Sequence, residues 1–177
     1  MRKITIAIDG HSSTGKSTVA KQLADYLGYI FVDSGAMYRA VTLFALRKGF
    51  ISETHFDKEK LIGSLREIQL AFKKNKEEKA EMYLNDKNVE KQIRTLEVSE
   101  FVSPIATVSE VRKKLVEQQQ EMGKEGGIVM DGRDIGSVVF PNAELKIFMT
   151  ASPQVRAERR YKELLDRGDA ISFEEVL

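Results

Sequence analysis

Residues 10–17 read G-H-S-S-T-G-K-S and match the phosphate-binding loop pattern G-x-x-x-x-G-K-[ST] at every fixed position. An apolar run with strand character precedes the loop at residues 4–8, and a run with helical spacing follows it at residues 19–27, with Gly28 as the expected C-cap. In this order of strand, loop and helix, backbone N–H groups and the helix N-terminus can hold a polyphosphate. Such a pattern can arise by chance in a glycine-rich turn, but the flanking strand and helix favour the functional interpretation.

The rest of the chain alternates between predicted strands and predicted helices, which is typical of a parallel sheet with helices on both faces. Further strands are predicted at residues 29–32, 127–130 and 145–149, and helices at residues 36–47, 104–121 and 153–167. The predicted fold class is therefore α/β, with a parallel sheet flanked by helices. We expect residues 1–177 to form a single domain.

The middle of the chain departs from this alternation. We interpret residues 67–93 as a small antiparallel β insertion, so that the core of the domain comprises about residues 1–66 and 94–177. The charge run at residues 73–79 has mixed signs, and we interpret it as the solvated tip of a hairpin in preference to a binding patch.

Two polar segments follow predicted strands and are therefore expected at the carboxyl edge of the sheet, where open α/β sheets bind ligands. The segment D-S-G-A-M-Y-R occupies residues 33–39, and D-G-R-D-I-G occupies residues 131–136. The first combines one carboxylate with an arginine, and the second combines two carboxylates with an arginine. An arginine can bind a phosphate through two hydrogen bonds, and an aspartate can accept from an exocyclic amine such as that of cytosine. These segments indicate an anionic substrate with a hydrogen-bonding group at its other end.

The loop and the second segment also predict a metal site. Lys16 is expected on the β- and γ-phosphates and the Ser17 hydroxyl on Mg²⁺. Asp131 ends a buried apolar strand, so we expect it to hold Mg²⁺ through the water shell of the ion.

Composition excludes several other classes of protein. The chain has 42% hydrophobic and 31% charged residues and a net charge of +1, which argues against disorder and against general nucleic-acid binding. It has no cysteine, which excludes a disulfide framework, a thiolate metal site and thiol catalysis. Only three residues precede the first apolar run, so we expect no membrane association and a cytoplasmic location. We also expect a monomer.

With V-S-P-I-A-T-V-S-E-V-R at residues 102–112, the loop and the two polar segments resemble bacterial cytidylate kinase, the nucleoside monophosphate kinase that phosphorylates CMP and dCMP. The likeness runs from Met1 to about Arg160, and N-D-K-N-V-E-K-Q-I-R at residues 85–94 resembles the extra β insertion of that family. The resemblance implies a P-loop kinase fold, ATP as phosphoryl donor, Mg²⁺, and CMP and dCMP as small-molecule acceptors.

The resemblance also implies the site residues. The ATP site would consist of Gly10, His11, Ser12, Ser13, Thr14, Gly15, Lys16, Ser17 and Thr18. The monophosphate site would be lined by Ser34, Gly35, Tyr38, Arg39, Ser103, Arg112, Arg133 and Asp134. Within it, Ser103, Arg112 and Asp134 would contact the cytosine edge. Arg39 and Arg133 would lie near the acceptor phosphate.

The implied reaction is a direct in-line transfer of the phosphoryl group. No general base is needed, because a nucleotide phosphate is already an anionic nucleophile at neutral pH. Lys16, Arg133, Arg156 and Arg160 are the candidate catalytic residues. Four arginines fall on or near the helix where this kinase class has a mobile lid over ATP: Arg156, Arg159, Arg160 and Arg167. We therefore expect a partial lid beginning at about residue 156. The alternative is that the four are ordinary surface arginines of an amphipathic helix.

In the resembling family, the sequence continues beyond the position of residues 172–177 through a lid segment R-D-x-x-D-[ST]-x-R, a last strand and a terminal helix. We therefore expect this chain to bind ATP but to turn over more slowly than a longer form.

Two other functions remain open at this stage. In a P-loop kinase for another small acceptor, the Ser103, Arg112 and Asp134 set would be incidental. A nucleotide-binding switch module is the second, although the guanine-reading tetrapeptide N-K-x-D is absent, since residues 75–78 read N-K-E-E. The preference among CMP, dCMP and UMP also stays open.

Overall fold

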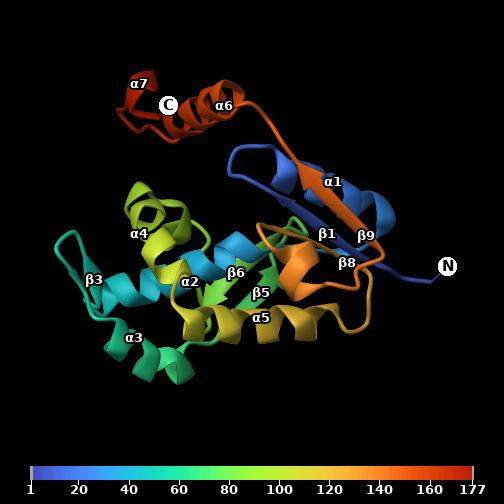
Figure 1. The fold of residues 1–177 in the computed structure, drawn as a ribbon, viewed down its shortest axis with the longest axis horizontal. Helices are drawn as coiled ribbons and strands as arrows, with labels where there is room; N and C mark the ends of the chain where they lie inside the picture. Colours follow the sequence, from blue (N-terminus) through green and yellow to red (C-terminus); the bar gives the residue numbers. More distant parts are fainter. Residues whose placement is uncertain (1, 177) are drawn as a thin grey trace. The chain divides into compact units, whose positions relative to one another are not determined.

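The computed structural model describes residues 2–176 (Figure 1). The chain divides into two compact units, the first formed by Met1–Phe31 with Gly126–Leu177 and the second by Val32–Glu125. The expectation of a single domain with a separate insertion stays a prediction.

The first unit is built on a parallel sheet. It contains β1 (Thr5–Gly10), β8 (Ile128–Gly132) and β9 (Leu145–Met149), and β2 (Ile30–Asp33) begins in it, giving the strand order β2-β8-β1-β9. The central strand β1 pairs in parallel on both sides, with Ile6 opposite Val129 on β8 and Leu145 on β9. This arrangement confirms the predicted parallel sheet.

Helix α1 (Lys16–Leu27) follows β1 and packs on the sheet (Figure 1). Its small residues Ala20 and Ala24 are fully buried, and they form a core cluster with Ile6 and Ile8 of β1 and Val129 of β8. The helix ends at the predicted C-cap Gly28, whose φ of 65° is a left-handed conformation that glycine adopts without strain. Helices α6 (Pro153–Asp166) and α7 (Phe173–Val176) complete the unit.

Two glycines give the loop between β1 and α1 its shape. Gly15 is the N-cap of α1 at a φ of 90°, and Gly10 has a φ of 154°. A Cβ atom on Gly10 would overlap the carbonyl oxygen of Met149 on β9. The loop therefore requires glycine at both fixed positions of the sequence pattern.

The second unit has a buried helix at its centre, α2 (Ser34–Arg47). Nearly every turn of α2 contributes to the core, through Ala36, Met37, Ala40, Val41, Leu43, Phe44 and Ala45. Helices α4 (Leu96–Ala106) and α5 (Ser109–Gly123) pack against α2 (Figure 1). Shorter elements complete the unit: the hairpin β3 (Ile51–Ser52) and β4 (His55–Phe56), helix α3 (Lys58–Ser64) and the 3₁₀ turns η1 (Leu65–Glu67) and η2 (Gln92–Arg94).

The predicted antiparallel insertion is confirmed. Strands β5 (Leu70–Lys74), β6 (Ala80–Leu84) and β7 (Lys87–Asn88) form a three-stranded antiparallel sheet. Asn85 and Asp86 both have positive φ between β6 and β7, which is the geometry of a tight hairpin turn. The tip at residues 75–79 is exposed except for the half-buried Asn75, and it carries the ion pairs Lys74–Glu78 and Lys79–Glu77, as its mixed charges predict.

The single helix predicted over residues 104–121 is wrong. Two helices, α4 and α5, meet there and are separated at Thr107 and Val108. Pro104 lies near the end of α4, and the start of that helix is capped by Thr95, whose hydroxyl accepts from the N–H of Val98 at 3.4 Å. The apolar face predicted for α5 is present, since Val111 and Leu115 are buried in the core.

Between β8 and β9 the chain forms a short π-helical turn, η3 (Ile135–Val139), which the sequence did not predict. Among the helices of residues 2–176, none combines the length and the apolar character that crossing a membrane requires.

Candidate functional site

An open cavity of about 320 Å³ lies beside the loop after β1, at the start of α1. Within the loop, the Thr14 hydroxyl and the Lys16 ammonium both donate to the carbonyl oxygen of His11, at 2.9 and 3.1 Å. The cavity is lined by Ser13, Gly15, Lys16, Ser17, Thr18, Arg159 and Glu163. Predicted donor residues and two side chains of α6 therefore share one cavity.

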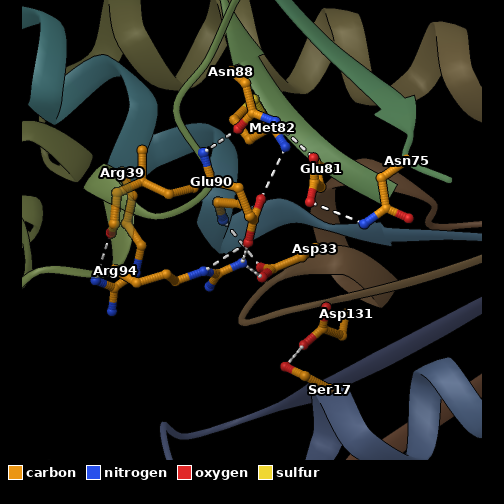
Figure 2. A network of polar contacts seen from close by, with 12 residues as sticks. Ser17, Asp33, Arg39, Asn75, Glu81, Met82, Asn88, Glu90, Arg94 and Asp131 are labelled. Atoms are coloured by element: carbon orange, nitrogen blue, oxygen red, sulfur yellow. Dashed lines mark hydrogen bonds and ion pairs between the residues drawn. The ribbon is translucent and has the colours of Figure 1, made fainter. Parts of the chain in front are cut away.

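Ser17 and Asp131, the two predicted metal ligands, are in direct contact. The Ser17 hydroxyl donates to Oδ2 of Asp131 at 2.6 Å (Figure 2). Asp131 is only 2% exposed and lies on β8 opposite Ile8 of β1, directly before the end of the strand. In residues 2–176 no group of three or more His, Cys, Asp or Glu side chains could hold a metal. A serine with one aspartate fits Mg²⁺, which binds few protein oxygens and completes its shell with water and phosphate.

Asp9, which the sequence analysis did not single out, supports the segment after β8. Its carboxylate accepts from the N–H groups of Ile135 and Gly136, both at 2.8 Å. These contacts fix the chain directly after Arg133, which is exposed, and Asp134, which is half-buried. The position of Asp9 at the end of β1, directly before Gly10, is the signal that could have identified it.

Helix α6 carries the predicted arginines Arg156 and Arg160. Arg160 forms an ion pair with Glu163 at 3.1 Å, and within the described residues the buried Nε of Arg156 has no hydrogen-bond partner. It is Arg159, between them, that contacts the loop, donating to the carbonyl oxygen of Thr14 at 2.9 Å. The sequence placed Arg159 on this helix over ATP but did not single it out from its neighbours, because residue spacing alone does not show which side of a helix meets a loop.

In the second unit, the start of α2 carries the other predicted set. Asp33 caps the helix, its Oδ1 accepting from the N–H of Ala36 at 3.0 Å. Ser34 is 4% exposed, and Gly35, Tyr38 and Arg39 are half-buried. Arg39 donates to the Ser99 hydroxyl on α4 at 2.7 Å.

The second oxygen of Asp33 contacts a residue that the sequence analysis did not identify. Arg94 donates to Oδ2 of Asp33 at 2.8 Å and to Oε1 of Glu90 at 3.0 Å (Figure 2). Burial by itself would lower the pKa of Arg94, but the two carboxylates outweigh it and hold this pKa above its usual value. The guanidinium is therefore a permanent cation between two anions.

The remaining predicted residues lie on either side of the break between α4 and α5. Ser103 is exposed near the end of α4, and Arg112 is half-buried in the first turn of α5. Their contact with a nucleotide base stays a prediction.

Comparison with known proteins finds one matching family model and several relatives that are similar over the whole chain. The family model described as cytidylate kinase matches residues 6–177. A cytidylate kinase of Flavobacterium psychrophilum is 66% identical over the whole chain, which covers 79% of that protein. The corresponding values are 67% and 77% for a cytidylate kinase of Flavobacterium johnsoniae, and 60% and 78% for one of Phocaeicola vulgatus.

Proposed function

Because the chain belongs to the cytidylate kinase family, we propose that it transfers the γ-phosphoryl group of ATP directly to CMP and dCMP, forming CDP and dCDP. The observation that carries the proposal is the family match over residues 6–177 in a chain whose phosphate loop contacts the strand-end carboxylate Asp131. We propose further that the protein works as a monomer in the cytoplasm.

In the proposed donor site, residues 10–18 surround the phosphates of ATP with N–H groups, and Lys16 neutralises charge on the β- and γ-phosphates. Ser17 and Asp131 would hold Mg²⁺, which offsets phosphate charge when bound. Their direct contact at 2.6 Å supports this pairing, because it brings two hard oxygen ligands together at the end of the loop.

In the proposed acceptor site, Arg39 and Arg133 bind the phosphate of CMP and Ser34, Gly35 and Tyr38 line its surroundings. Ser103, Arg112 and Asp134 contact the cytosine edge. Asp134 is suited to accept from the exocyclic amine, and Asp9 supports it by fixing the backbone of the next two residues.

The chemistry requires positioning more than proton transfer. The acceptor phosphate attacks as an anion, so the chain supplies positive charge where negative charge accumulates, through Lys16, Arg133, Arg156 and Arg160. The hydrogen bond from Arg159 to the carbonyl oxygen of Thr14 supports a role for α6 beside the donor phosphates.

The test is the release of ADP from ATP with CMP, dCMP, UMP, AMP and GMP as acceptors. We expect CMP and dCMP to give the largest kcat/KM. A clear preference for another monophosphate would contradict the proposed acceptor. Nucleotide binding without acceleration by any of the five would instead indicate a binding module.

A further inference from the structure

The guanidinium group of Arg94 bridges two carboxylates of the second unit (Figure 2). It contacts Oδ2 of Asp33 at the start of α2 and Oε1 of Glu90 after β7. The other oxygen of Glu90, Oε2, accepts from the backbone N–H of Met82 on β6 at 2.9 Å. A chain of hydrogen bonds therefore runs from the start of α2 to the middle of the β insertion.

Asp33 connects this series of hydrogen bonds to α2. One of its oxygens caps the helix through the N–H of Ala36, and the other accepts from Arg94. The two bonds together fix the carboxylate, and hence the first turn of α2, relative to Arg94. That turn carries Ser34 and Gly35, and the next carries Tyr38 and Arg39.

Arg39 is attached to the same region from the other side. It donates to the Ser99 hydroxyl at 2.7 Å and to the carbonyl oxygen of Ile93 at 3.4 Å. Ile93 directly precedes Arg94. The segment before α4 is therefore contacted by Asp33 at the start of α2 and by Arg39 one turn later.

The charges make the arrangement sensitive to the loss of Arg94. The side chains of Arg94, Asp33 and Glu90 are 35%, 17% and 26% exposed, so water screens them only in part. Without the guanidinium, two carboxylates that now share one cation would face each other. A lysine keeps the charge but lacks the planar fork that reaches both carboxylates.

We propose that Arg94 is a positioning residue for the acceptor nucleotide. Through its hydrogen bonds to Asp33 and Glu90, it links the start of α2 to the β insertion and so sets the orientation of Ser34, Tyr38 and Arg39. The inference deepens the proposed function and rests on it. Arg94 acts here through Asp33 and not through the reacting atoms.

The experiment compares Arg94→Met, Arg94→Lys and Glu90→Gln with the control Glu81→Gln. Glu81 is a matched control because it lies on the same β insertion and accepts from the side chains of Asn75 and Asn88 (Figure 2). Its carboxylate is not one of the two that accept from Arg94. For each variant, KM is measured separately for CMP and for ATP. Exchange of the Ala36 amide hydrogen is measured without nucleotide.

We expect Arg94→Met to raise KM for CMP on the order of tenfold with KM for ATP nearly unchanged, because only the acceptor residues lose their orientation. Arg94→Lys and Glu90→Gln raise KM for CMP by smaller factors, and Glu81→Gln leaves both KM values unchanged. Exchange of the Ala36 amide accelerates about tenfold in Arg94→Met, since the cap loses its support.

Equal changes in both KM values, or an unchanged CMP KM in Arg94→Met, would overturn the proposal. Unchanged exchange at Ala36 would overturn it as well. If Arg94→Met does not fold, Glu90→Gln decides by the same two readouts. If the wild-type protein does not phosphorylate CMP, the proposed function is refuted instead. The exchange of the Ala36 amide needs no substrate and would still decide the role of Arg94.

Discussion

Single side chains at the proposed donor and acceptor sites are held in place by hydrogen bonds to their neighbours. Ser17 is fixed on Asp131 by a 2.6 Å hydrogen bond, and Lys16 contacts the His11 carbonyl within its own loop. Asp9 anchors two successive backbone N–H groups after Asp134. Because such preorganised groups need little rearrangement during phosphoryl transfer, single substitutions here are expected to affect the reaction more than the fold.

The ammonium group of Lys16 provides the first prediction at this scale. Lys16→Ala should reduce kcat for ATP-dependent transfer on the order of a hundredfold, or about 3 kcal/mol, because a charge that acts in the transition state is lost. Thermal unfolding should stay near wild type. The control is Lys21→Ala on the same helix, whose ammonium lies over the ring of Phe31 and outside the cavity. Near-normal turnover in Lys16→Ala would refute the assignment of the loop.

Asp134 provides the second prediction. In Asp134→Asn the amide can donate as well as accept, so the site should tolerate the O4 acceptor of uracil, and preference for CMP over UMP should fall on the order of tenfold. The measurement is kcat/KM for each nucleotide, with KM for ATP as the internal reference. Equal factors for CMP and UMP would mean that Asp134 does not read the base.

Some of these residues could be predicted from sequence and others could not. Ser17 and Asp131 occupy fixed places, at the end of the loop and the end of a buried strand, so their contact could be anticipated before the fold was known. Arg94 and Asp33 are 61 positions apart, and neither stands in a pattern that names the other. Their pairing depends on how η2 packs beside α2, which a single sequence does not specify.

At the scale of elements, hydrophobic periodicity and helix-start or helix-end residues determine most boundaries of the strands and helices. The strands after residue 127 and the helix opened by Pro153 agree with prediction, because apolar runs and an N1 proline are strong local signals. The break between α4 and α5 was missed because the apolar spacing continues across it, and the predicted helix began at Pro104, whereas α4 begins at Leu96 after its cap Thr95. The β3–β4 hairpin is too short to carry a periodic pattern.

Two glycines allow a matched test of the loop. Gly10→Ala should destabilise the protein by roughly 1–3 kcal/mol, because its φ and its approach to Met149 exclude a side chain. Gly63→Ala should be neutral or stabilising by up to about 1 kcal/mol, since Gly63 is helical with nothing within 4 Å of an added Cβ. Denaturant midpoints give both values. Equal midpoints for the two variants would contradict the conformation assigned to the loop.

At the scale of the whole molecule, the chain builds the phosphate loop and the predicted metal ligands in one unit and α2 with the β insertion in the other. The first unit is formed by residues from both ends of the sequence, which come together in one parallel sheet. Local patterns predict that sheet, because parallel strands joined by helices have few alternative arrangements.

The central claim is that the γ-phosphoryl group of ATP passes to CMP and not to water. The most direct measurement follows the label of γ-³²P-ATP in the presence and absence of CMP. Its stoichiometry does not depend on how fast the chain turns over. We expect one labelled CDP for each ADP formed, and no comparable loss of ATP without CMP. Label recovered as inorganic phosphate at the same rate with and without CMP would contradict it.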